Sequence, residues 1–540
     1  MTERAALATG PLRRRRRPPL LLVACALATV ALVTLPLGYL AVRAGTGGVD
    51  AWAVLGRHRT AELVASTVVL VALVTVAAVA VGVPLAWLVT RTDLPRRRFW
   101  AVAAALPLVV PSYVAALVLL AAFGPRGLLQ GLLEGPFGVE RVPEIYGLPG
   151  AVVALTLSTY PYVYLLAAAA LRDFDPSLEE ASLSLGRTPG ETFRRVTLPM
   201  LRPSVGAGAL LVALYALSDF GAVSLMQYDS LTRAIFLQYK ALFDRTPAAV
   251  LALVLVALTA AVLALEARVR GRRRYHRSTP GAPRPAPVAT LGRWRWPALA
   301  FCAGVVGVGL LVPLAVIGYW LARAVSLGEG LGAAWEAAAN SVLVSAVAAG
   351  AAVLAALPVA LLSTRHSARW TRALERLSYA SNALPGIVIA LSLVFFAANY
   401  ASPVYQTLAL LVFAYVIRFL PQAVSGAASA FVRVNPRIEE AARGLGRSPA
   451  RAFLEVTAPL AAPGLLAGAA LVFLSTMKEL PATLLLRPIG FETLATEVWT
   501  ATTVGFYSRA ALPALLLILL AAPFVYLLTT RRDVGVDAHG

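Results

Sequence analysis

The sequence has few charged, thiol and imidazole side chains, and each shortage excludes a class of protein. Charged residues make up 14% of its 540 residues, against roughly 25% in soluble domains, which excludes an ordinary soluble fold. The two cysteines, Cys25 and Cys302, stand singly inside apolar runs without metal-ligand spacing, so we expect reduced, packed thiols. The four histidines are scattered, and neither HExxH nor G-x-S-x-G occurs. We therefore expect no catalytic residues and no metal ligands, and an intramembrane enzyme is disfavoured.

Lysine is nearly absent from the chain. Lys240 and Lys478 are the only two, and neither follows a glycine, so the phosphate-binding sequence G-x-x-x-x-G-K-[ST] does not occur. We therefore expect this chain to bind no nucleotide and no other cofactor. ATP hydrolysis by this chain is therefore not indicated.

Long apolar runs fill most of the sequence. Hydrophobic residues make up 59% of the chain, and the mean hydropathy is +0.75. Runs that cross about 30 Å of hydrocarbon have to be helices, because lipid offers the backbone no hydrogen-bond partners. We predict an all-α polytopic membrane protein of about 12 transmembrane helices. The predicted spans lie near residues 20–42, 62–90, 100–123, 148–171, 203–226, 247–266, 297–321, 338–363, 377–398, 405–424, 463–477 and 510–529.

The basic residues predict the orientation of these spans. With the amino terminus inside, the inward segments hold 35 Lys and Arg and the outward segments hold 12, while Arg418 lies within a span. This bias follows the positive-inside rule, so we expect both termini in the cytoplasm of a bacterial inner membrane. The net charge of +21 comes from basic residues in loops that lie beside membrane lipid. Nucleic-acid binding is therefore not indicated.

The spans fall into two halves of six, joined by a basic, proline-rich segment that we interpret as a solvated linker. The predicted parts are a basic cytoplasmic tail (1–19), a first half (20–266, core about 60–266), the cytoplasmic linker (267–296), a second half (297–530, core about 337–529) and a short cytoplasmic tail (531–540).

An internal repeat relates the two halves. DPSLEEASLSLGRTPGETFRRVTLPMLRP (Asp175–Pro203) aligns without a gap with NPRIEEAARGLGRSPARAFLEVTAPLAAP (Asn435–Pro463), 260 residues later. We call these stretches the first and second polar loops. Arg91 matches Arg365 at a separation of 274, so the first half carries about 14 extra residues in an outward loop. Four predicted spans precede each polar loop and two follow it, so the halves are parallel repeats, pseudo-symmetric about the membrane normal, with a pathway at their interface.

Each polar loop predicts a helix, a glycine turn and a second helix. Asp175-Pro176 and Asn435-Pro436 place an Asx residue at a helix N-cap and proline at the first helical position. Gly186 and Gly446 stand where a helix ends in a left-handed residue. An exposed helix pair of this kind is suited to docking.

The second helix of each loop has its own start signal. Thr188-Pro189-Gly190-Glu191 fits a capping box, and Ser448-Pro449 repeats the cap and the proline without the glutamate.

The polar loops resemble the coupling-loop motif of binding-protein-dependent ABC-transporter permeases: E-A-A, a glycine four residues on, an aromatic residue, and L-P. The departures are Ser182 for the second alanine and Ala458 for the leucine before proline. The resemblance implies the type I ABC importer permease fold, two ABC ATPase subunits that bind ATP and dock on these loops in the cytoplasm, and an extracytoplasmic substrate-binding protein. The docking residues that it implies are Glu179, Glu180, Ala181, Gly186, Glu439, Glu440, Ala441 and Gly446.

Two further stretches concern the substrate. Leu217–Tyr239 and Ser475–Trp499 resemble segments of the fused ferric-iron permeases, which implies import of Fe(III). Fused permeases for thiamine, phosphonate or polyamines share the architecture and stay as alternatives. A secondary transporter driven by an ion gradient is the alternative from another class, and it would leave the two capped loops unexplained.

Asp219 and Glu479 are the candidate pathway residues. They match at a separation of 260, about 16 residues beyond the polar loops or roughly 24 Å along a helix, at the outer ends of the fifth and eleventh spans. Two hypotheses stay open: the pair lines the outer mouth and favours a cation, or each carboxylate ties down an outer loop with Lys478 or Arg233 as partner. Helix irregularities are expected at the prolines of the spans, namely Pro84, Pro111, Pro161, Pro358, Pro385 and Pro421.

Overall fold

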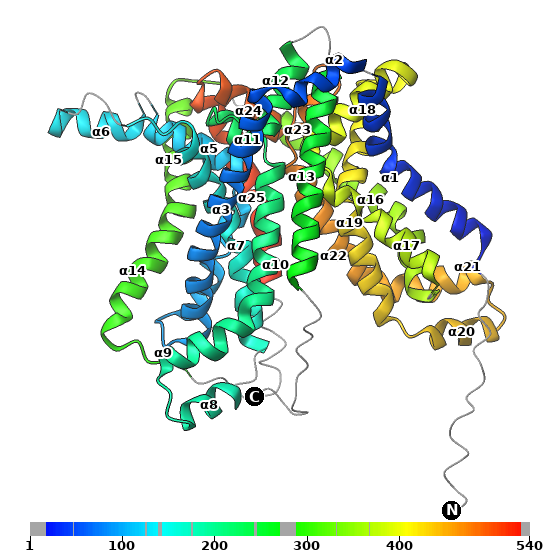
Figure 1. The fold of residues 1–540 in the computed structure, drawn as a ribbon, viewed down its shortest axis with the longest axis horizontal. Coiled ribbons are helices and arrows are strands. Elements are labelled where there is room, and N and C mark those ends of the chain that lie inside the picture. The colour runs from blue at the N-terminus through cyan, green and yellow to red at the C-terminus, as the bar shows by residue number, and fades with distance from the viewer. Residues whose placement is uncertain are drawn as a thin grey trace, which may run out of the picture. The chain divides into compact units, whose positions relative to one another are not determined.

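The computed structural model describes nine ranges of the chain, and helices dominate them (Figure 1). No β-strand occurs among these residues; one isolated bridge pairs Thr92 with Ala289. The amino- and carboxyl-terminal tails, most of the linker and Asp175-Pro176 lie outside them. The described ranges are 18–46, 48–124, 127–138, 143–173, 177–241, 246–270, 288–330, 332–366 and 368–530.

Eleven helices in this part of the chain are long and apolar enough to cross a membrane, or twelve when one bent pair counts as a span. This agrees with the twelve predicted spans. Ten of the eleven helices are formed by α1 (Leu20–Thr46), α3 (His58–Arg91), α7 (Leu148–Asp173), α10 (Leu198–Ser218), α13 (Thr246–Arg270), α14 (Arg295–Val306) with α15 (Val312–Ser326), α16 (Gly332–Arg365), α19 (Leu408–Arg433), α22 (Ala458–Met477) and α25 (Tyr507–Thr530). The eleventh starts with α5 (Ser112–Phe123).

The third and ninth predicted spans are broken at matching prolines. In the first half α4 (Arg97–Ala103) and a 3₁₀ turn (η2, Leu106–Val109) end before Pro111, and α5 (Ser112–Phe123) starts directly after it. In the second half α17 (Arg369–Ser378) and α18 (Gly386–Tyr400) are separated at Pro385, with a bend of 98°.

Both prolines have extended ψ angles, 151° and 149°, and cap the helix that follows. The expected irregularity therefore occurs at these two positions. The other four prolines of that set lie inside assigned helices: Pro84, Pro161, Pro358 and Pro421.

The fifth predicted span, 203–226, needs a correction at both ends. The helix α10 starts earlier, at Leu198, and ends at Ser218, because Asp219 takes an extended conformation with φ −68° and ψ 132°. A short helix, α11 (Gly221–Leu225), follows the break. The second half repeats this arrangement, since α22 ends at Met477 and α23 (Pro481–Leu486) follows.

The chain forms two compact units that do not coincide with the two halves of the sequence. The small unit comprises residues 1–35, 346–382 and 415–476, and the large unit comprises residues 36–345, 383–414 and 477–540. In the large unit α3, α7 and α10 lie side by side (Figure 1). Each unit is described by itself below.

Small residues bring the helices of each unit close together. A Cβ atom on Gly208 of α10 would lie 2.8 Å from the Val163 Cα atom of α7. Gly468, at the matching position of α22, packs on Gly426 of α19, where an added Cβ would lie 3.3 Å from the Gly426 Cα atom. Such contacts are typical of helix packing in membranes, where small residues let backbones approach. The internal repeat therefore extends to the packing of the helices.

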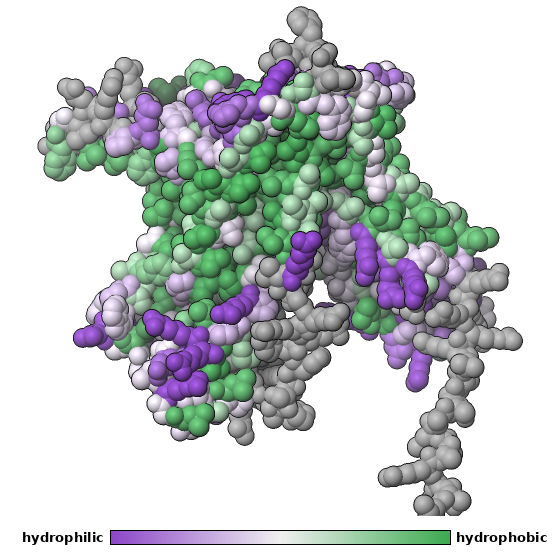
Figure 2. Space-filling view, viewed as in Figure 1, coloured by the Kyte–Doolittle hydropathy of each residue, from purple (hydrophilic) through white to green (hydrophobic). Residues whose placement is uncertain are grey.

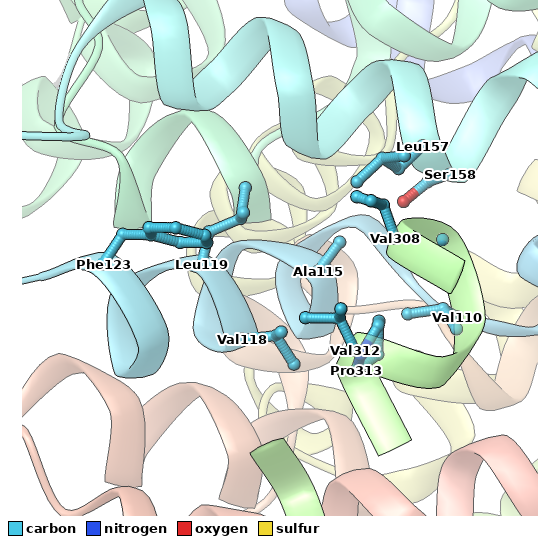
Figure 3. A pocket seen from close by; sticks show the side chains of 11 residues that line it. Val110, Ala115, Val118, Leu119, Phe123, Leu157, Ser158, Val308, Val312 and Pro313 are labelled. Carbon is cyan, nitrogen blue, oxygen red and sulfur yellow. The ribbon is translucent and has the colours of Figure 1, made fainter. Parts of the chain in front are cut away.

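Segments of the second half pack on the first half within the large unit. The π turn η5 (Gly307–Leu311) between α14 and α15 lies against η2, where a Cβ on Gly309 would be 3.1 Å from Pro107 Cγ. Figure 3 shows a small pocket beside it, and Ser158 is the one polar residue among those lining it. The Ser158 hydroxyl donates to the Ala154 carbonyl of its own helix at 3.0 Å. This pocket is therefore unsuited to an ion.

The surface of the long helices suits a lipid environment. Apolar side chains cover their sides in Figure 2, and polar side chains gather toward their ends. Val76 of α3 is 67% exposed and Leu354 of α16 is 68% exposed. Exposed aliphatic side chains along a span are stable in hydrocarbon and unfavourable in water.

Candidate functional sites: the polar loops and a junction of helix breaks

The first polar loop folds as a helix, a left-handed glycine and a second helix. The helix α8 (Ser177–Ser184) ends before Gly186, whose φ is +82°. The Gly186 N–H group donates to the Leu183 carbonyl at 2.9 Å, which closes the end of the helix. The chain then enters α9 (Pro189–Thr192), a π turn (η3, Phe193–Thr197) and α10 without a further break. The loop is therefore continuous with a membrane span.

The second polar loop has the same form. The Asn435 side chain caps α20 (Pro436–Gly444) by accepting the Arg437 N–H group at 3.0 Å, as predicted. Gly446 has a φ of +87°, and α21 (Pro449–Ala452) and a π turn (η8, Phe453–Thr457) lead into α22. The predicted helix, turn and helix are confirmed in both loops.

The predicted start signals of the second helices are also present. In the first loop the Glu191 carboxylate accepts the Thr188 N–H group at 3.1 Å, and the Glu191 N–H group donates to the Thr188 hydroxyl at 3.3 Å. This is a complete capping box. In the second loop the Ser448 hydroxyl accepts the Arg451 N–H group at 3.4 Å.

The first glutamate of each pair is turned toward the protein. Glu179 accepts the Thr197 hydroxyl at 2.6 Å, and Glu439 accepts the Thr457 hydroxyl at 3.0 Å. Both bonds join the first helix of the loop to the π turn that opens the following span. The second glutamate and the alanine are exposed in both loops, namely Glu180, Ala181, Glu440 and Ala441. The two glutamates of each pair therefore have different surroundings.

The loops differ in how they are tied to the neighbouring span. In the first loop Glu179 also pairs with Arg91, the last residue of α3, at 3.4 Å, and the Arg91 side chain is 4% exposed. In the second loop Glu439 pairs with Arg443 of its own helix. The matching arginine, Arg365, instead donates to the Val434 carbonyl at 3.4 Å. The first loop is thus joined to its span by an ion pair with a buried arginine, and the second by a bond to the backbone.

Two exposed leucines extend the candidate docking surface, and the sequence pattern did not single them out. Leu185 is 78% exposed and Leu445 is 85% exposed, each directly before the left-handed glycine. Both leucines therefore stand at the exposed tip of a polar loop, beside the exposed glutamate and alanine. The signal available in the sequence was the Leu-Gly pair present in both loops.

Asp219 and Glu479 cap the short helices that follow the two breaks. The Asp219 carboxylate accepts the N–H groups of Ala222 at 3.0 Å and Val223 at 3.3 Å, and it accepts the Ser112 hydroxyl. The Glu479 carboxylate accepts the Ala482 N–H group at 3.4 Å. Both carboxylates are 7% exposed. A carboxylate at a helix start is stabilised by these donors and by the helix dipole.

The two basic residues suggested as partners of these carboxylates make other contacts. Arg233 pairs with Asp229 at 2.6 Å, and the Lys478 ammonium donates to the Leu108 carbonyl at 2.8 Å. Among the described residues, no group of three or more His, Cys, Asp or Glu side chains could hold a metal ion.

Three helix breaks meet in the large unit. They are the breaks before Ser112, at Asp219 and at Glu479, and we call this place the break junction (residues 108–113, 218–221 and 478–480). A Cβ atom on Gly221 would lie 2.8 Å from Tyr113 Cβ and 3.1 Å from Leu480 Cδ2. The structure therefore brings the two predicted pathway segments, one from each half, into direct neighbourhood.

Comparison with known proteins divides the chain into the two halves that the internal repeat indicates. A family model described as the binding-protein-dependent transport system inner membrane component matches residues 78–275 and again residues 352–532. Each matched range contains one polar loop and the span that follows it.

Three relatives illustrate the similarity. The chain is 35% identical over 518 residues to the Fe(3+)-transport system permease protein FbpB 2 of Haemophilus influenzae, covering 95% of this chain and 98% of that protein. It is 24% identical over 452 residues to the ferric transport system permease protein FbpB of Actinobacillus pleuropneumoniae, covering 79% of this chain and 65% of that protein. It is 30% identical over 242 residues to the molybdenum transport system permease protein ModB of Mycobacterium tuberculosis, covering 44% of this chain and 89% of that protein.

Proposed function

This chain belongs to the family of inner-membrane components of binding-protein-dependent transport systems, and we propose that it carries Fe(III) into the cytoplasm. It is a fused ABC-importer permease of two halves, since the family model matches each half separately. The observation that supports Fe(III) as the substrate is the 35% identity, over 95% of this chain, to a protein named for Fe(3+) transport. Both termini would lie in the cytoplasm, and a binding protein would deliver the ion from outside.

The two polar loops are where two ATPase subunits would dock in the cytoplasm. Each loop presents an exposed glutamate, an exposed alanine and an exposed leucine around a left-handed glycine. Short, rigid, capped helices lose little conformational freedom on binding, which favours a partner that has to engage and move them repeatedly. Nucleotide binding would belong to these partners.

The loop contacts suggest how ATPase movement reaches the pathway. The first loop continues into α10, whose 21 residues span roughly 31 Å. The Glu179 carboxylate ties α8 to Thr197 at the start of that helix and to Arg91 at the end of α3. A displacement of the loop would therefore move two spans together, and α10 would transmit it to the break at Asp219.

The break junction would close the outer part of the pathway in the state seen here. Segments from both halves touch there, at Gly221 and Leu480. In alternating access these segments separate to admit the ion and meet again before it is released inside. Asp219 and Glu479 would then have two roles, since each caps a short helix and both supply negative charge for a cation.

Uptake of radioactive iron tests this proposal. Cells that contain or lack this chain are compared, with thiamine, phosphonate and polyamines as competitors. The proposal expects uptake that depends on the chain and resists all three competitors. Uptake indifferent to deletion of the chain would remove the iron assignment, and competition by one of the three compounds would assign that substrate instead.

A further inference from the structure

Lys478 is one of only two lysines in the chain, and it lies at the break junction. Lys478 is half-buried, and its ammonium group donates to the backbone carbonyl of Leu108 at 2.8 Å. Leu108 belongs to the 3₁₀ turn η2 that precedes Pro111. The hydrogen bond therefore joins a residue of the second half to the backbone of the first half.

This bond has no counterpart in the pseudo-symmetric position. Ser218 occupies the place in the first half that matches Lys478 at the separation of 260, and serine is too short to reach across in the same way. The neighbouring residues do repeat, because Asp219 and Glu479 both cap the short helix that follows. Lys478 is thus a residue of the second half that the repeat does not supply in the first.

The chemistry of the ammonium group makes this a strong, charge-assisted hydrogen bond. An ammonium group carries three donors and no acceptor, and its charge is costly away from water unless an acceptor faces it. The Leu108 carbonyl is such an acceptor, because it stands at a helix break. Separation of the two halves at the junction would strip the ammonium of this acceptor. The bond therefore favours the closed junction.

We propose that Lys478 is a positioning residue for transport, whose ammonium holds the two halves together at the break junction until the pathway opens outward. The proposal rests on the proposed function, in which the junction closes the outer part of the pathway. Opening then requires the ammonium to leave the Leu108 carbonyl. Binding-protein docking and ATP together have to supply the free energy that breaks this hydrogen bond.

The test compares Lys478→Met with Lys478→Arg and with Lys240→Met. Methionine keeps the length of the side chain and removes the charge and the donors, while arginine keeps both. Lys240 is the other lysine of the chain, and it lies over the Phe236 ring at 4.8 Å, away from the junction contacts described above. Lys240→Met therefore controls for the loss of one positive charge.

The first readout is ATP hydrolysis by the permease and its ATPases in lipid, without binding protein. Loss of a charge-assisted hydrogen bond shifts a two-state equilibrium by about tenfold, so Lys478→Met should raise this basal activity roughly tenfold. Lys478→Arg and Lys240→Met should stay close to the unmodified complex. A structural defect would also lower the midpoint of thermal unfolding, so a raised basal activity with an unchanged midpoint separates the two explanations.

The second readout needs neither ATPases nor iron. Leu480 is 2% exposed and lies beside Gly221 of the other half, so Leu480→Cys reports opening of the junction. With Cys25 and Cys302 replaced by alanine, labelling by a membrane-impermeant thiosulfonate should be about tenfold faster beside Lys478→Met. Equal labelling rates and equal basal activities would overturn the proposal, and so would Lys478→Arg behaving like Lys478→Met. Failure of ATP-dependent iron uptake would refute the proposed function and leave the labelling test intact.

Discussion

The left-handed glycines of the polar loops allow a sharp test of docking. Gly186 and Gly446 have φ angles of +82° and +87°, and no atom lies within 4 Å of a Cβ added to either. The Cβ atom of a new side chain would therefore meet no steric obstacle from the rest of the protein. The whole penalty would come from the backbone conformation, which β-branched residues resist. We expect Gly186→Val and Gly446→Val to impair docking of the ATPases.

The magnitude follows from the conformation alone. A left-handed backbone costs an L-residue roughly 1–2 kcal/mol relative to its preferred conformations. If the docked state needs the turn, this cost weakens docking at one loop by roughly five- to thirty-fold. Asparagine tolerates the left-handed region better than other residues, so Gly186→Asn should lose less than Gly186→Val.

Binding of the ATPase to the permease in lipid nanodiscs measures the effect, and ATP-dependent uptake measures its consequence. Gly190→Val and Gly444→Val are matched controls, because these glycines lie in the same loops, have equally open surroundings and do not have a positive φ. The controls should bind the ATPase as the unmodified permease does. Equal binding by Gly186→Val and Gly190→Val would refute the argument that the turn presents the docking surface.

Three further experiments have expected outcomes. Arg91→Met should lower the free energy of unfolding by about 3 kcal/mol, against about 1 kcal/mol for Arg365→Met, because the buried Arg91 pairs with the Glu179 carboxylate whereas Arg365 donates to a backbone carbonyl; equal midpoints of unfolding would contradict this. Leu185→Ser should weaken ATPase binding about tenfold with an unchanged midpoint, since this side chain is 78% exposed; an unchanged Kd would count against the docking surface. The double substitution Asp219→Asn with Glu479→Gln should preserve stability within about 1 kcal/mol, because amide oxygens still accept the helix N–H groups. Iron uptake should fall, and normal uptake would contradict the pathway role.

Much of the architecture could be predicted because membrane burial and helix capping are local in sequence. Apolar runs of about 20 residues report spans whatever their neighbours are. Caps use side chains within three residues of the helix start, so Asn435 and the Thr188–Glu191 box could be identified directly. The glycine turns at Gly186 and Gly446 followed from the same local rule.

The remaining features depend on contacts that sequence spacing does not contain. Pro84 lies inside a helix and Pro111 stands at the N-cap of one, although both occur in apolar runs, so the run alone does not distinguish them. The ion-pair partner of Glu179 is Arg91, which lies 88 residues away in the chain. The partner of Lys478 is a backbone carbonyl 370 residues away, and backbone acceptors leave no trace in the sequence.

Iron uptake into sealed vesicles tests the central claim most directly. The permease, its ATPase and the loaded binding protein are reconstituted with the ATPase side accessible to added nucleotide, and movement of radioactive iron is followed with and without ATP. We predict iron transport that requires ATP and the binding protein and persists when ionophores collapse every ion gradient. Transport that continues without ATP and stops with the ionophores would contradict the account and assign the chain to gradient-driven transport.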